Sequence, residues 1–275
     1  EQFGAPYHGK FFQDNAGEHG VEWHTARNIY DSTAVQAHIQ LASSLPGSLT
    51  NPAIKWFELQ WRDENPSQAA KEWLEMAGNK MFNELQESNF NLEANGVYKN
   101  ITSFATAVIT EEANADPTEP WAGLNFTNVP LKQAYFEPND KGQCLHFYRH
   151  LQWRASKLVA KFGLENLPER IRSAYESAED TNTFDVIFCV FTRLDKLNQP
   201  DAVIPPNNRP YGWAYVLRHG HEDKTLAEGG YYEMPAYVAR WEVTSESMWG
   251  NGPAHVALAD VLSLNRYVEL DLRAR

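Results

Sequence analysis

Apolar residues recur every three or four positions through the last part of the chain, which predicts one long helix. Pro253 follows a short Gly-Asn-Gly stretch and suits the first helical position, because its φ is already helical and its missing N–H needs no partner there. Neither Gly nor Pro interrupts the segment from Ala254 to Arg275. We therefore expect a helix that starts at Pro253 and continues further in the natural protein.

This final helix carries more apolar surface than one contact requires. Its first face, with Pro253 at the start, is a candidate subunit interface and comprises Pro253, Ala254, Ala257, Leu258, Val261, Leu264, Val268 and Leu272. Val256, Leu262, Tyr267 and Leu270 widen the apolar arc beyond that face. We expect neighbours on more than one side of the helix, and other copies of the chain could supply them.

The first hundred residues are predicted to be mainly helical after an N-terminal arm. Helical periodicity and capping residues predict helices over 32–44, from Pro66 to about Glu87, and over 90–102, the first of them interrupted at Pro46. Between the first two, residues 55–62 alternate between apolar and polar side chains, as a half-buried strand requires.

Strands dominate the middle of the chain. We expect a buried strand over 103–110, and further strands over 124–129, 133–137, 144–153, 184–193, 211–219 and 232–241. Short helices are predicted over 155–162 and 168–178, and 194–210 is predicted to be an exposed loop. Because helices come first, a mostly antiparallel sheet follows and a long helix ends the chain, the predicted fold class is α+β.

Charge limits the partners that the chain can hold. The 36 acidic and 24 basic residues give a net charge of −12, which opposes tight binding of a phosphate backbone. The two cysteines, Cys144 and Cys189, are interpreted as small buried hydrophobic residues rather than as a disulfide. No run of 18 apolar residues occurs, so we expect a soluble intracellular protein without a membrane partner.

The sequence contains no recognisable catalytic, cofactor or metal site. Cys144, His146 and His150 would share one face of a strand, but three ligands without a fourth are a poor zinc site. Nucleophile elbows, phosphate-binding glycine loops and HExxH helices are absent from the sequence. We expect no metal, no cofactor and no enzymatic activity.

Nine tryptophans raise a second possibility, a carbohydrate-binding or glycoside-cleaving domain. Five of them fall at predicted core or junction positions, where burial is the expected role: Trp56, Trp61, Trp73, Trp153 and Trp241. Trp213 and Trp249 are less clear. A carboxylate-lined cleft around those two residues would favour the carbohydrate hypothesis.

A series of short stretches resembles, in order, the head-to-tail connecting (portal) proteins of short-tailed phages. The earlier stretches are 29–34 with 41–43, Trp56-Phe57 with Leu59, Trp73-Leu74, 88–90, and Phe162-Gly163 with Leu167-Pro168. The last and most specific set comprises 229–231, Pro235, Arg240, Trp241, Gly250, Gly252, Pro253, Ala254, Ala257, Leu258, Asp260, Leu264 and Asn265.

This resemblance implies a domain plan. Residues 1–24 would form an N-terminal arm, 25–250 the wing, and 251–275 the start of a stem helix, while clip, tunnel loop and crown are not present in this sequence. Pro46 departs from the uninterrupted first helix that the family implies.

The resemblance also implies a structural role: a homo-oligomeric ring of about twelve copies at one capsid vertex. Double-stranded DNA would pass through the ring non-specifically during packaging and ejection. The implied partners are the terminase, the major capsid protein, the scaffolding protein and a tail adaptor protein. The ring would be assembled in the host cytoplasm and remain in the virion as a platform for the tail.

The final helix supplies the DNA-facing candidates. Positions about half a turn from the interface face include Asp260, Ser263, Arg266 and Arg273, and we expect them to point towards the channel or an outer groove. Both charge signs are present, so any charged band around the duplex should be weak.

Overall fold

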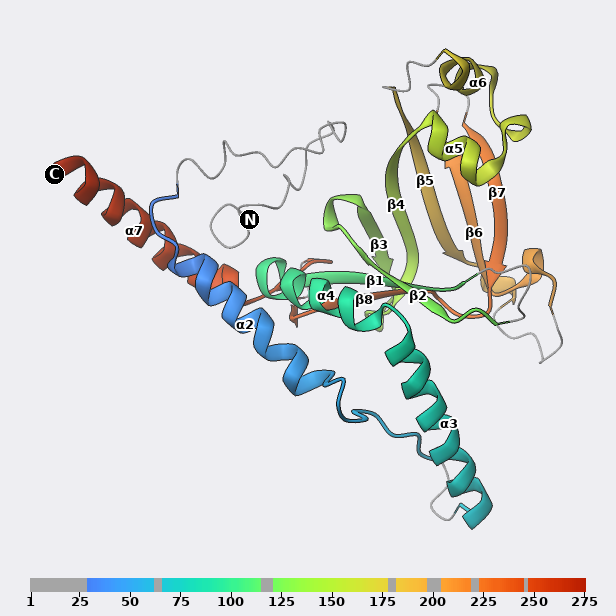
Figure 1. Cartoon of the computed structure of the whole chain (residues 1–275), viewed down its shortest axis with the longest axis horizontal. Helices are drawn as coiled ribbons and strands as arrows, with labels where there is room; N and C mark the ends of the chain where they lie inside the picture. The colour runs from blue at the N-terminus through green and yellow to red at the C-terminus, as the bar shows by residue number, and fades with distance from the viewer. Residues whose placement is uncertain are drawn as a thin grey trace. The chain divides into compact units, whose positions relative to one another are not determined.

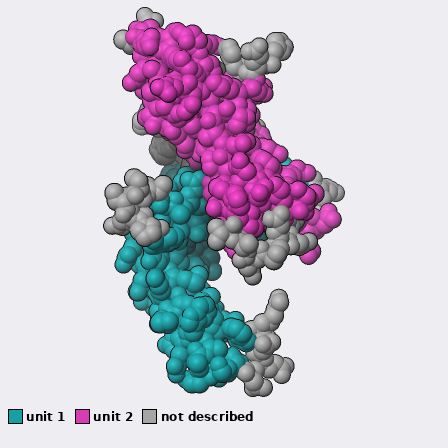
Figure 2. All heavy atoms as spheres, turned by 90° about the vertical axis from the view of Figure 1, so that its right-hand side faces the viewer, with its two compact units in different colours: residues 1–9, 21–129, 238–275 teal, residues 10–20, 130–237 magenta. Residues whose placement is uncertain are grey.

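The computed structural model describes residues 29–61, 66–114, 121–177, 182–196, 204–218, 223–244 and 247–275. Within these ranges the chain forms helices, antiparallel strand pairs and a long C-terminal helix (Figure 1), which confirms the predicted α+β class. It divides into two compact units, 1–9 with 21–129 and 238–275, and 10–20 with 130–237 (Figure 2). The predicted N-terminal arm lies outside the described residues.

The first unit holds the four longer helices. They are α2 (Thr33–Leu49), α3 (Gln68–Glu87), α4 (Phe90–Phe104) and α7 (Pro253–Ala274). The start of α3 is fixed by Ser67, whose side chain accepts a hydrogen bond from the Ala70 amide at 3.2 Å. α7 starts at Pro253, as the sequence predicts.

A three-stranded sheet in the same unit has the order β2-β1-β8. Its strands are β1 (Thr106–Ala113), β2 (Leu124–Val129) and β8 (Ala236–Arg240), and a separate pair is formed by β9 (Glu242–Val243) and β10 (Gly250–Asn251). Ala107, Val108 and Val129 are completely buried. α4 packs on this sheet, so the sheet and α4 form the core of the first unit.

The second unit is built on a five-stranded antiparallel sheet of order β3-β4-β5-β6-β7. The strands are β3 (Ala134–Pro138), β4 (Cys144–Arg154), β5 (Thr183–Thr192), β6 (Tyr211–Leu217) and β7 (Lys224–Tyr231). Two short helices follow β4, namely α5 (Ala155–Phe162) and α6 (Glu169–Glu176). Leu158 and Ile171 on these helices are buried, as are Phe147, Val186 and Val190 on the sheet.

Two predictions in the helical region were wrong. Residues 55–61 alternate in exposure as predicted, with Phe57 and Leu59 more covered than their neighbours, but they pair with no described strand. Leu59 instead lies against Gly78 of α3, so a helix supplies the apolar contact that a sheet was expected to supply. Pro46 does not end α2, which continues to Leu49 because Pro46 falls in the last turn and removes only one helical hydrogen bond.

Two strand boundaries also differ from the prediction. β1 starts at Thr106 rather than at residue 103, because α4 extends to Phe104. The predicted strand over 232–241 is shorter, β8, and β7 was missed altogether. β7 contains Gly229 and Gly230, which have no side chain to produce an alternating pattern.

Two segments of backbone that are distant in the sequence pass close to each other where α4 meets β1. Ala105 adopts a left-handed conformation with φ 56°, and its carbonyl oxygen accepts a hydrogen bond from the Trp241 amide at 2.9 Å. The Gly250 amide donates to the buried Thr106 hydroxyl at 2.8 Å. A Cβ on Gly250 would collide with the Ala105 carbonyl oxygen, and one on Gly252 would lie 2.7 Å from the Ala105 Cβ. The chain can therefore reach the start of α7 only with glycine at these positions.

We predict that Gly250→Ala lowers the free energy of unfolding by about 3 kcal/mol, because the added methyl group meets a backbone oxygen that cannot move aside. Gly47→Ala is the matched control. Gly47 lies in α2 with open space around it, so alanine there should raise the stability by about 0.5–1 kcal/mol. Urea unfolding followed by circular dichroism measures both. Equal stability of the two variants would contradict the close crossing.

Candidate assembly interface

Helix α7 is almost entirely exposed in the single chain. Val256 and Tyr267 are 78% and 71% exposed, and Leu258, Leu262, Leu264, Leu270 and Leu272 are exposed as well. A monomeric protein rarely leaves so large an apolar surface uncovered. These exposed fractions agree with the expectation that the helix has more apolar surface than its own domain covers.

One side of α7 forms the wall of an apolar groove. α2 packs near the first turns of α7 (Figure 1), and with α4 the two helices enclose a cavity of about 380 Å³. Six of the eight proposed interface residues line it: Pro253, Ala254, Ala257, Leu258, Val261 and Leu264. Ala34, Ala37 and Leu41 form the opposite wall, and His38 approaches the hydroxyls of Thr102 and Ser103 at 3.1–3.2 Å. Val268 and Leu272 lie further along the helix.

Asn265 joins α7 to the start of α2. It is the buried residue of α7, and its side-chain oxygen accepts hydrogen bonds from the amides of Tyr30 at 2.7 Å and Asp31 at 3.3 Å. These three residues belong to the stretches that carry the family resemblance, although they are 234 and 235 positions apart. Sequence reasoning placed Asn265 on the helix but did not predict this contact, because no local pattern connects such distant residues.

The charged residues of α7 neutralise one another along the helix. Glu269 binds both Arg266 and Arg273, each at 2.6 Å, and Arg275 binds Asp271 at 2.9 Å. Ser263 donates to the Ala259 carbonyl, and Asp260 also borders the groove. The arginines proposed to face the channel are therefore engaged in ion pairs along the helix, which lowers the positive charge they can offer to a phosphate.

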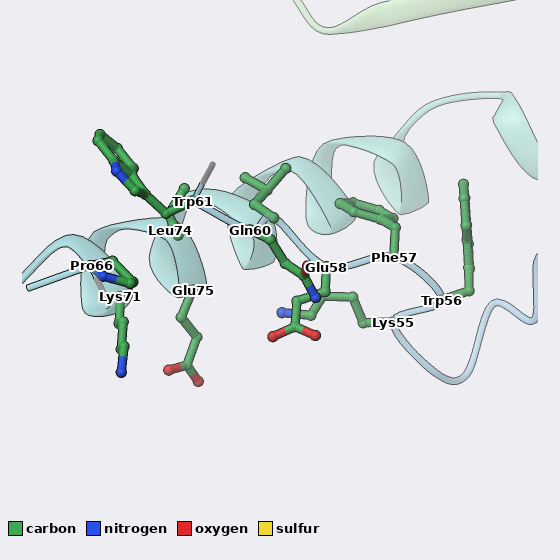
Figure 3. A pocket seen from close by; sticks show the side chains of 11 residues that line it. Lys55, Trp56, Phe57, Glu58, Gln60, Trp61, Pro66, Lys71, Leu74 and Glu75 are labelled. Atoms are coloured by element: carbon green, nitrogen blue, oxygen red, sulfur yellow. The ribbon is translucent and has the colours of Figure 1, made fainter. Parts of the chain in front are cut away.

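A second exposed surface lies on α3 and residues 55–61 (Figure 3). The two segments border an open hollow of about 950 Å³, and Lys71 and Glu75 extend from α3 on one side of it. Trp73 and Met76 on α3 are 58% and 63% exposed. Phe57 turns towards α3.

The predicted burial of the tryptophans was mostly wrong. Trp153 is buried, but Trp56, Trp61, Trp73 and Trp241 are all exposed to 40% or more. Their positions in predicted strands and helices, or at junctions between them, suggested burial, whereas a helix such as α3, with few neighbours in the described chain, leaves its outer side open.

No metal or catalytic centre is visible in the described residues. His150 lies 3.0 Å from Asp185, His146 accepts from the Thr192 amide, and the Cys144 thiol contacts the His146 carbonyl. Among the residues that the structure describes, no group of three or more His, Cys, Asp or Glu is placed to hold a metal ion. Burial raises the pKa of the Cys189 thiol, which favours its protonated form.

The alternative carbohydrate site finds no support in the described geometry. Trp213 is half-buried and packs between Tyr215 and Tyr231, with ring centroids 5.9 and 6.2 Å apart. Trp249 is half-buried too. The strand residues that share a sheet face with Trp213 include no carboxylate in the described part of the sheet.

Comparisons with known proteins agree with one another. A family model described as bacteriophage head to tail connecting protein matches residues 1–275. The portal protein of Salmonella phage epsilon15 is 26% identical over 242 residues, which cover 86% of this chain and 42% of the relative. The probable portal protein of Bordetella phage BPP-1 is 26% identical over 263 residues, or 94% of this chain and 45% of the relative. The chain thus spans less than half the length of these relatives.

We predict that Asn265→Ala exposes the amides of Tyr30 and Asp31 to solvent, because it removes the oxygen that accepts their hydrogen bonds. Hydrogen exchange of these two amides should accelerate at least tenfold, and the protein should lose about 1–2 kcal/mol of stability. Asn265→Asp keeps an acceptor and should retain most of the protection. Ser263→Ala on the exposed side of α7 is the control. Unchanged exchange in Asn265→Ala would show that another group protects these amides.

Proposed function

We propose, because this chain belongs to the bacteriophage head to tail connecting protein family, that it is a structural portal subunit which assembles into a ring of about twelve copies. The ring would occupy one capsid vertex of the virion, after assembly in the host cytoplasm. It would let double-stranded DNA through during packaging and ejection and hold the tail. The exposed apolar surface of α7, together with the family match over the whole chain, carries this proposal.

A closed ring needs each copy to present two different surfaces, one for each neighbour. In this proposal α7 is the start of the stem and residues 25–250 are the wing. The interface face of α7 and the groove beside it provide one apolar surface, which the exposed Leu262 widens on the side of Leu258. Such a helix gains stability only when neighbouring copies cover it.

The DNA-facing side of the ring would be Ser263, Arg266 and Arg273, with Asp260 at its edge. From Pro253 to Arg275 the chain holds three arginines and three carboxylates, so this segment is neutral apart from His255. A neutral lining suits a conduit, since each phosphate held by a cation adds salt-dependent affinity and slows sliding.

The remaining partners follow from the proposed location. They are the terminase, which would supply ATP hydrolysis, the major capsid and scaffolding proteins, and a tail adaptor protein. No chemistry is assigned to this chain itself. No described helix is long and apolar enough to cross a membrane.

We predict that Leu258→Asp prevents assembly. An aspartate in the groove would be buried without a partner when a neighbour docks, at a cost of about 3 kcal/mol, which raises the dissociation constant of the assembly more than a hundredfold. Ser173→Asp adds the same charge at an exposed position of α6 and should assemble normally. Light scattering coupled to size-exclusion chromatography measures the mass of the particles. A wild-type protein that stays monomeric at high concentration would overturn the ring.

We predict weak, sequence-independent binding of duplex DNA that disappears at physiological salt. Glu269→Gln should strengthen this binding, because it releases Arg266 and Arg273 from their ion pairs. Two freed cations per copy steepen the dependence of log affinity on log salt by up to about 2. Glu176→Gln makes the same charge change on α6 and should have no effect. Tight wild-type binding that survives salt, or depends on base sequence, would point to a DNA-recognition protein instead.

A further inference from the structure

An extended segment, residues 55–61, runs beside α3 (Figure 3). Its inward-facing side chains hold it there. The Lys55 ammonium donates to the Asn79 side-chain oxygen at 2.7 Å. Leu59 lies against Gly78 of the helix. The segment has the side-chain arrangement of a half-buried strand supported by a helix, because the residues between the inward-facing ones are exposed, namely Trp56, Glu58 and Gln60.

The main chain of this segment takes no part in the hydrogen bonding of the fold. Within the part of the chain that the structure describes, no main chain or side chain forms a hydrogen bond with an N–H or C=O group of residues 56–60. In an extended chain these groups point sideways, alternately towards the two edges. Water satisfies them in the single chain, but a row of such groups is also a template for a further strand.

Two other strand edges of this chain are protected by side chains. At β2, the Asn89 side chain accepts a hydrogen bond from the Phe126 amide at 2.7 Å and donates one to the Phe126 carbonyl at 2.8 Å, as a neighbouring strand would. At β7, the Gly230 carbonyl accepts a hydrogen bond from Arg209 at 2.9 Å. Proteins protect strand edges in such ways to prevent unwanted pairing. Residues 56–60 lack this protection and form an open edge.

The open hollow beside the segment can hold several residues of another chain. Its volume of about 950 Å³ is at the upper end of the range of about 300–1,000 Å³ that is usual for ligand pockets. On the α3 side Leu74 is half-buried, and Lys71 and Glu75 extend beside it (Figure 3). A strand in the hollow would have one face on Leu74 and the other in water. The charged residues of the hollow balance one another: Lys55, Lys71, Glu58 and Glu75.

We infer that residues 56–60 bind an extended segment of another protein by strand addition, with the added strand lying in the hollow on α3. The partner's main chain pairs with the open edge, which supplies the recognition. Its side chains alternate between apolar residues that contact Leu74 and polar residues that face water. Because the charges of the hollow balance, the partner strand has little net charge. The site belongs to the single chain, so the inference goes beyond the proposed ring and does not depend on it.

A strand from a second copy of this chain is the alternative occupant. The edges of β2 and β7 are already bonded in the single chain, and β3 has an irregular register between Glu137 and Pro138. Bulges and prolines interrupt strand pairing. These three strands are therefore poor partners for the open edge, whereas a second protein can supply a regular strand.

Peptide binding tests the main-chain pairing. The probe is a short fluorescent peptide of alternating valine and threonine with a lysine at each end. Fluorescence anisotropy should give saturable binding with a dissociation constant below about 1 mM. Two matched peptides carry N-methyl groups on all valines or on all threonines, which removes the donors along one edge and keeps the side chains. One of the two should bind about tenfold more weakly. No binding of the unmodified peptide, or equal binding of all three, would overturn the inference.

Substitutions on α3 test the position of the strand. Leu74→Glu places a charge beneath the added strand and should weaken binding of the unmodified peptide about tenfold. Met76→Glu makes the same change on the exposed side of α3, outside the hollow, and should bind as wild type does. Circular dichroism checks that both variants are folded. Equal binding by the two variants would contradict a strand in the hollow.

Hydrogen exchange identifies the paired edge. With the unmodified peptide bound, either the even-numbered or the odd-numbered amides of residues 56–60 should exchange about tenfold more slowly, because a strand pairs along one edge only. Unchanged exchange of all five would contradict the pairing. If assemblies of this chain alone already protect these amides, a second copy occupies the edge and the inference is wrong while the ring stands. If the chain binds the peptide but never assembles, the ring fails and the strand site stands.

Discussion

The close crossing of the backbone at Ala105 determines where α7 can begin. The hydrogen bonds of Ala105 with Trp241 and of Thr106 with Gly250 bring segments about 140 residues apart into contact at the end of α4. Because Gly250 and Gly252 have no Cβ, the chain passes within contact distance of the Ala105 backbone before Pro253 starts the helix. The crossing, the α4–β1 core and the start of α7 consequently form one packed structure.

Beyond this junction α7 depends on partners that the single chain does not contain. α2 and α4 cover only part of its apolar side chains, and its charged side chains pair with one another within the helix. α3 also leaves apolar side chains exposed. Residues 55–61 cover its inner side, whereas Trp73 and Met76 on its outer side remain exposed. Both helices make physical sense as parts of a larger assembly, in which exposed apolar area becomes buried area.

Much of the fold could be predicted from local patterns. β2 and the starts of β4, α5 and α7 agree with the predicted positions, because alternation, the turn around Gly142, and Pro253 are all signals carried by neighbouring residues. The errors arose where the decisive contact is distant. Residues 55–61 have strand periodicity but meet a helix, β7 lost its pattern to Gly229 and Gly230, and exposed tryptophans cannot be told from buried ones without knowing their neighbours. The role of Asn265 was beyond prediction for the same reason, as its partners lie 234 and 235 positions away. The proposed interface and channel residues remain predictions.

The contact between Asn265 and the Tyr30–Asp31 backbone has a mechanical consequence. A pull along the axis of α7 reaches the start of α2 through this side-chain amide as well as through the packing of α7 on α2 and α4, because the intervening covalent chain is far too long to become taut. Two hydrogen bonds to a single oxygen resist such a load only over a fraction of an ångström before they break, and they re-form when the load is released. The amide therefore ties this part of α7 to the start of α2 for small displacements only, while the packing of α2, α4 and α7 resists larger ones.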